Sequence, residues 1–103
     1  MMFEDLLQKA VAVRQLYAKY EKEHYGSSWT TAEIALGFVG DVGDLAKLIL
    51  AADARREIPD ARDKLAHELA DCLWSLLVLA HAYEVDLERA FLRTMADLEQ
   101  KLS

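Results

Sequence analysis

The sequence predicts an all-α protein, a four-helix bundle that is completed by oligomerisation. Only one Pro and four Gly interrupt the 103 residues, and apolar residues recur at intervals of three and four through most of the chain. This spacing predicts helices and no strands. A chain of this length has room for one domain, residues 1–103, which buries a smaller fraction of its surface than a larger domain does. Self-association would therefore help to stabilise it.

The first half of the chain predicts two helices. The first covers about residues 2–23 and has one charged face. Its apolar stripe consists of Phe3, Leu6, Leu7, Ala10, Val13, Leu16, Tyr17 and Tyr20. After a polar break, Thr30 and Glu33 have the spacing of a capping box, in which two side chains bond free amides at a helix start. A second helix is therefore expected over about residues 31–54, with the apolar stripe Ala35, Phe38, Val39, Val42, Leu45, Ala46 and Ile49.

The second half predicts two more helices. The connection over residues 55–60 is charged and holds the only Pro, so a third helix should begin near Pro59 or Asp60. Residues 65–83 are apolar on most sides, which is typical of a helix buried all round and needs cover from a second subunit. Asp86 is expected to cap a fourth helix. Its inward-facing residues would be Leu87, Ala90, Phe91, Met95, Leu98 and Leu102.

Charge and composition exclude several classes of protein. The 12 Lys and Arg against 18 Asp and Glu give a net charge of -6, which argues against a nucleic-acid binder. Cys72 is the only cysteine, so nothing requires an oxidising compartment. The N-terminal segment is too charged for a signal peptide, and the apolar stretch 72–83 is shorter than the about 20 residues that span a bilayer. We expect a cytoplasmic protein that binds neither nucleic acid nor membrane.

Two pairs of acidic residues carry the strongest functional signal. Asp41 and Asp44 lie three residues apart among apolar neighbours, and Glu68 and Asp71 repeat this spacing on the next helix. Antiparallel packing of the two helices would bring the four carboxylates together, where they repel one another. A hard divalent cation such as Mg²⁺ relieves that repulsion and leaves positions for water and phosphate. Either pair alone would suggest a solvated acidic face, but two equally spaced pairs favour a metal site.

Three glycines interrupt the same helix at intervals of three: Gly37, Gly40 and Gly43. Each costs about 1 kcal/mol relative to Ala inside a helix. They provide either close contact between helices or space for a ligand beside the backbone, and the two interpretations are compatible.

The acidic segments resemble those of MazG-like nucleoside triphosphate pyrophosphohydrolases. Residues 35–46 resemble the family segment with Glu-x-x-Glu, and residues 68–74 resemble the one with Glu-x-x-Asp, closest in style to the dCTP pyrophosphatase-like branch. The resemblance implies a homodimer or homotetramer that uses Mg²⁺, or Mn²⁺ in its place. The substrate would be a (d)NTP, with a lean toward a pyrimidine deoxynucleotide, and the products a monophosphate and pyrophosphate. Asp41, Asp44, Glu68 and Asp71 would be the metal ligands, and Asp41 is also the candidate general base.

Substrate contacts are expected from three further residues. Trp29 precedes the acidic helix, where the resemblance favours stacking on a nucleobase, although it could instead close the end of the bundle. Arg93 and Lys101 are the candidates for phosphate contacts, because Thr94 and Leu98 stand where related enzymes often carry Lys and Asn.

Asp41 and Asp44 also depart from the family, since they replace Glu and shorten each arm by one methylene. These departures leave open a weakened or inactive homologue that binds a nucleotide or a protein, or a purely structural helical oligomer.

Overall fold

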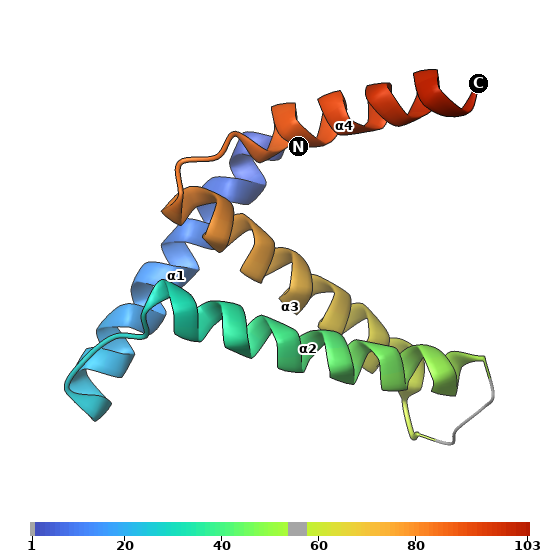
Figure 1. Cartoon of the computed structure of the whole chain (residues 1–103). Coiled ribbons are helices and arrows are strands. Elements are labelled where there is room, and N and C mark those ends of the chain that lie inside the picture. The colour runs from blue at the N-terminus through green and yellow to red at the C-terminus, as the bar shows by residue number, and fades with distance from the viewer. Residues whose placement is uncertain (1, 54–57) are drawn as a thin grey trace.

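The structure, a computed structural model, describes residues 2–53 and 58–103. Within these ranges it has four α-helices and no strands, so the predicted all-α fold class is confirmed (Figure 1). The helices are α1 (Phe3–Tyr25), α2 (Thr31–Ala52), α3 (Ala61–Ala82) and α4 (Leu87–Leu102). Of the expected elements, the end of the second helix at residue 54 and the connection over residues 55–57 lie outside the described residues.

Both predicted helix caps are present. Thr30 Oγ1 accepts a hydrogen bond from the Glu33 amide at 3.2 Å, and Glu33 Oε1 accepts one from the Thr30 amide at 3.0 Å. Asp86 Oδ1 accepts from the Arg89 amide at 3.1 Å. These bonds satisfy amides that have no partner inside a helix, which fixes the starts of α2 and α4.

The third helix starts where its connection predicts, just after Pro59 and Asp60. Asp60 is the N-cap residue, but it lies in the left-handed region at φ 55° and makes no capping hydrogen bond through its side chain. Pro59 precedes the helix and is not part of its first turn.

The core forms around α3, which packs against both α1 and α2. Figure 1 shows α2 and α3 side by side and antiparallel. The most deeply buried side chains belong to α3, where Ser75 and Leu77 are each only 3% exposed. Trp74 ties α3 to α1, because its Nε1 donates to the Ala10 carbonyl oxygen at 3.1 Å. The acidic helices are thus held in one packed unit.

Within the single chain α3 is not covered on all sides, and the cover from a second subunit that its composition predicts stays a prediction. Leu69, Leu73 and Leu76 are 51%, 45% and 44% exposed, because α1 and α2 cover only part of the helix surface. Among the described residues, α3 is also the one helix that is long and apolar enough by composition to cross a membrane. The central helix of a helical core has the same composition, and Glu68 and Asp71 would be costly inside a bilayer.

The expected inward orientation of α4 is wrong for the single chain. Figure 1 shows α4 extending away from the other three helices, and it has no buried residue. Phe91, Leu98 and Leu102 of its apolar face are 58%, 44% and 82% exposed. The turn after α3, in which Glu84 has φ 56°, directs α4 away from α1 and α2. The helix α4 is amphipathic as predicted, but no other helix of the described chain covers its apolar face.

The glycines of α2 make no close helix contact within the described chain. A Cβ atom placed on Gly37, Gly40 or Gly43 would meet nothing within 4 Å among those residues. We therefore expect Gly43→Ala to raise the free energy of unfolding by about 1 kcal/mol, since Ala is the better helix former and fits without a clash. Urea denaturation measures this change. A loss of stability would contradict the expectation and would indicate a contact with a second molecule at Gly43.

Candidate functional site

The packing of α2 against α3 brings the four predicted acids together around Glu68. One carboxylate oxygen each from Asp41, Asp44 and Glu68 lie within 4.8 Å of one another. A second group with the same limit consists of His67, Glu68 and Asp71. Glu68 belongs to both groups, so it joins the α2 acids to Asp71. The shorter Asp side chains therefore still reach the acids of α3. The proximity is as predicted, and the metal-binding role stays a prediction.

The electrostatics of these acids favour a bound cation. Burial raises the pKa of Asp41 above its usual value, and the negative charges of Asp71 and Asp44 raise it further. Burial followed by the charges of Asp71, Asp41 and Asp44 likewise raises the pKa of Glu68. Glu68 Oε2 is buried and has no hydrogen-bond partner among the described residues. Because an unpaired buried oxygen is costly, and hard divalent cations bind carboxylates, the residues present fit such an ion.

His67 is the one cationic partner that the structure places on these acids within the described residues. Its Nε2 lies 3.2 Å from Asp71 Oδ2, and the two side chains are 72% and 42% exposed. This is the surface ion pair that the spacing of residues 67 and 71 suggests. When protonated, His67 lowers the pKa of Asp41 and Glu68, which partly offsets the effect of the other acids.

A cavity of about 550 Å³ lies beside the acids and includes Asp41 and Asp71 in its lining. Its walls come from α1, α2, α3 and the connection between α1 and α2. Five aromatic side chains line it: Tyr17, Tyr20, Tyr25, Trp29 and Trp74. Gly37 also lines the cavity, which agrees with the interpretation that a glycine leaves space for a ligand. Acidic and aromatic surfaces therefore meet in one concave site.

Of the three predicted substrate contacts, only Trp29 lines this cavity. Its side chain is 51% exposed, so it forms a wall and is not buried in the end of the bundle. Arg93 and Lys101 lie on α4 and are not part of the cavity lining. Arg93 instead borders a separate, shallow depression at the start of α4. Within one chain, the structure does not bring these two cations to the acids.

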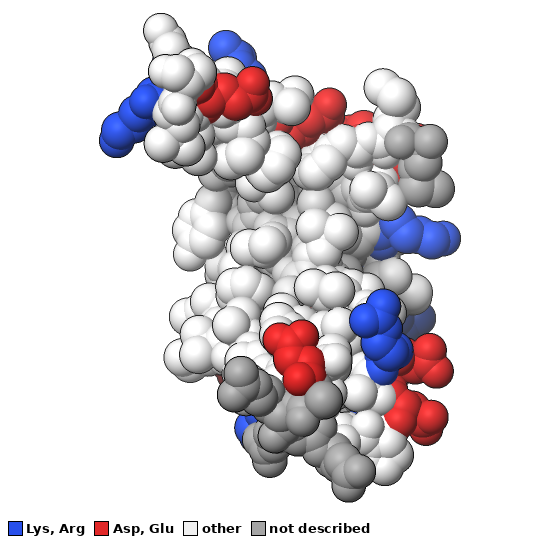
Figure 2. Space-filling view, turned by 90° about the vertical axis from the view of Figure 1, so that its right-hand side faces the viewer, with Lys and Arg blue, Asp and Glu red and all other residues white. Residues whose placement is uncertain are grey.

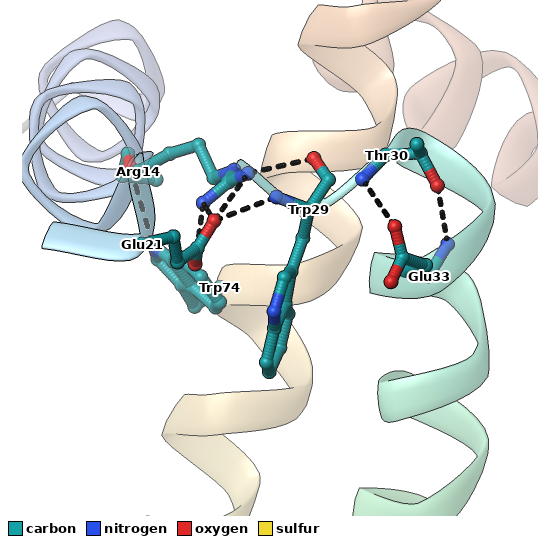
Figure 3. Close-up of polar contacts among 7 residues, drawn as sticks. Arg14, Glu21, Trp29, Thr30, Glu33 and Trp74 are labelled. Carbon is teal, nitrogen blue, oxygen red and sulfur yellow. Dashed lines mark hydrogen bonds and ion pairs between the residues drawn. The ribbon is translucent and has the colours of Figure 1, made fainter. Parts of the chain in front are cut away.

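The cavity wall contains an ion pair that the sequence analysis missed. Arg14 and Glu21 are joined by contacts of 3.1 to 3.3 Å, and Glu21 is only 5% exposed (Figure 3). The Trp29 amide donates to Glu21 Oε1 at 2.8 Å, and Arg14 Nη2 donates to the Trp29 carbonyl oxygen at 3.0 Å. The sequence signal was the separation of seven residues, about two helical turns, which places opposite charges on one face.

The protein is thus an all-α protein in which an acidic cluster lies beside an aromatic cavity. Such a site is suited to a cation and a small aromatic ligand. The sequence profile of the MazG nucleotide pyrophosphohydrolase domain matches residues 30–102, which include all four acids. The chain therefore belongs to the MazG nucleotide pyrophosphohydrolase family. Members of this family are NTP pyrophosphohydrolases and usually use a divalent metal. Comparisons with curated proteins and with solved structures give no match.

Divalent cations should stabilise the protein through Glu68. We expect Mg²⁺ or Mn²⁺ to raise the melting temperature of the wild-type protein, since an ion that binds only the folded state shifts the folding equilibrium. Glu68→Gln should melt higher than the wild type without metal, because it removes a negative charge that the neighbouring acids repel, and should lose most of the metal response. Asp63→Asn, an exposed acid on the same helix, is the control and should respond like the wild type. An unchanged metal response in Glu68→Gln would contradict the site.

Without a divalent cation, the acids should make the folded protein less stable as the pH rises. The pKa values of Asp41 and Glu68 are raised above 3.8 and 4.5, so the folded state holds these protons more tightly than the unfolded chain. Their stabilising contribution is full below those ordinary values and is lost as the pH rises through the raised ones. Denaturation in EDTA between about pH 4 and pH 7 should therefore show Glu68→Gln gaining stability over the wild type with rising pH. A constant difference would contradict the raised pKa of Glu68.

Proposed function

We propose that the protein is a divalent-cation-dependent nucleotide pyrophosphohydrolase that cleaves a (d)NTP to the monophosphate and pyrophosphate. A pyrimidine deoxynucleotide is the first substrate to test. One observation carries the proposal: Asp41 and Asp71 belong both to the acidic cluster around Glu68 and to the lining of the aromatic cavity. A nucleotide has matching halves, since its triphosphate needs a cation and its base needs an apolar surface.

The cavity suits the base and sugar of a nucleotide. Its volume of about 550 Å³ lies within the range of small-molecule sites, roughly 300–1,000 Å³. Aromatic rings stack on flat partners, and Trp29 offers a half-exposed ring at the cavity wall. The triphosphate would extend toward the acids. It cannot bind four carboxylates directly, because the charges are alike, so a cation has to lie between them.

The chemical roles follow from the positions of the acids. A divalent ion held by Asp41, Asp44, Glu68 and Asp71 would neutralise phosphate charge and lower the pKa of a water molecule. Hydrolysis requires water to attack the α-phosphorus, with pyrophosphate as the leaving group. Asp41 is the candidate that accepts the proton of this water, because it belongs both to the acidic cluster and to the lining of the cavity. The aromatic wall holds the base so that the α-phosphate lies beside Asp41.

A cytoplasmic homodimer or homotetramer is part of the proposal. Leu69, Leu73 and Leu76 on α3, together with the apolar side of α4, remain exposed in the single chain. In Figure 2 the visible face is largely uncharged over its middle, with Lys, Arg, Asp and Glu toward its ends and edges. Exposed apolar surface of this kind is typical of an interface with another molecule.

A panel of (d)NTPs with Mg²⁺ or Mn²⁺ tests the activity. We expect release of pyrophosphate together with the nucleoside monophosphate. Asp41→Asn should lower kcat by about 100-fold or more, the usual effect of losing a general base. Asp63→Asn, which keeps the cluster intact, should retain the wild-type rate. Release of orthophosphate in place of pyrophosphate, or no turnover of any nucleotide, would contradict the proposal.

A binding protein without turnover is the second candidate, and one observation favours it. The only cationic side chain in the cavity lining is Arg14, and it is already paired with Glu21. Within the described chain, no basic residue is therefore available at this cavity to stabilise the charge that develops on a phosphate. A nucleotide that raises the melting temperature but yields no product would identify this function.

A further inference from the structure

Within the connection between α1 and α2, Trp29 is the residue that lines the cavity. The buried ion pair Arg14–Glu21 of α1 binds the backbone of this tryptophan. We propose that Arg14 and Glu21 are positioning residues that hold Trp29 in the cavity wall and thereby set the affinity for the base half of the nucleotide. This inference rests on the proposed function. It assigns the pair no part in the chemistry at the acids.

The ion pair holds Trp29 at both backbone polar groups. Glu21 Oε1 accepts from the Trp29 amide at 2.8 Å, while Arg14 Nη2 donates to the Trp29 carbonyl oxygen at 3.0 Å. The same guanidinium binds Glu21 through Nη1 and Nη2, so one planar group orients the carboxylate and the tryptophan together. Figure 3 shows the Trp29 ring pointing away from Arg14 and Glu21. The backbone is held and the ring is left free for a ligand.

Trp29 needs such a hold because it belongs to no helix. The connection runs from Gly26, which ends α1, to Thr30, which caps α2. The Trp29 amide and carbonyl bond to Glu21 and Arg14 and not to a helix backbone, and the residue is 51% exposed. Ordering this segment before the ligand arrives avoids paying the ordering entropy on binding.

Stability alone is a weak reason for this pair. Burying two charges carries a desolvation cost, and replacing a buried pair with apolar residues is often neutral or stabilising. Arg14 and Glu21 side chains are only 14% and 6% exposed. Both line the cavity, whereas neither belongs to the acidic groups around Glu68. A change in the pair should therefore act on binding of the base and leave the step at the phosphates largely unchanged.

Kinetics of Glu21→Gln and Arg14→Lys separate base binding from chemistry. With the best (d)NTP of the panel, both variants should raise KM by about tenfold, because Trp29 loses one charge-assisted hydrogen bond that keeps it in place. The value of kcat should change by less than about twofold. Inhibition by inorganic tripolyphosphate, which has no base, should stay at the wild-type level. Glu23→Gln, the same change at an exposed position of α1, should behave like the wild type. Equal weakening of tripolyphosphate and nucleotide, or an unchanged KM, would overturn the inference.

Fluorine NMR tests the hold itself without turnover. Protein labelled with 5-fluorotryptophan should give separate signals for Trp29 and Trp74, assigned by Trp29→Phe. In Glu21→Gln and Arg14→Lys the Trp29 signal should shift or broaden while the Trp74 signal stays in place. An unchanged Trp29 signal would overturn the inference even if KM rises. If no nucleotide is hydrolysed by the wild type, the proposed function fails, and this measurement still decides whether the pair holds Trp29. If Glu21→Gln does not fold, Arg14→Lys, which keeps the charge, decides both tests.

Discussion

Antiparallel packing of α2 against α3 forces four carboxylates into one small volume, and the rest of the site depends on this constraint. Burial and the neighbouring negative charges raise the pKa of Asp41 and of Glu68, and Glu68 Oε2 has no partner within the described chain. Such an arrangement is costly for an empty protein, because like charges repel and a buried oxygen is left unpaired. A divalent cation removes both costs. The clustered carboxylates therefore destabilise the protein without a metal, and they are also the groups suited to bind a metal and, through it, a triphosphate.

The other half of the site is built by α1. The acids lie on α2 and α3, within the part of the chain that the MazG profile matches, whereas Arg14 and Glu21 precede it. Through α1 the cavity gains aromatic walls and the buried ion pair that holds Trp29. Contact with the phosphates and contact with the base are thus assigned to different helices. Because Trp74 joins α3 to α1, the two halves are fixed relative to each other.

Local chemistry made part of the structure predictable. Thr30 and Asp86 cap their helices as expected, because a cap depends on residues within one turn. The meeting of the four acids was also predictable. Each of the two neighbouring helices carries acids three residues apart, so contact between the pairs does not depend on one particular register of the helices. The orientation of α4 could not be predicted, since an amphipathic face fits its own chain or another one equally well. The spacing of Arg14 and Glu21 is visible in the sequence, but their hydrogen bonds to Trp29 are not, because Trp29 lies eight residues beyond Glu21 and outside the helix.

Every part of the proposed chemistry requires a divalent cation among Asp41, Asp44, Glu68 and Asp71. Crystals grown with Mn²⁺ test this site directly, because the anomalous signal of the ion locates it without assumptions about its ligands. We expect a peak at bonding distance, about 2.0–2.6 Å, from Glu68 Oε2 and from at least one acid of α2. A fully occupied Mn²⁺ elsewhere on the protein, with the four acids unchanged and no peak between α2 and α3, would contradict this site.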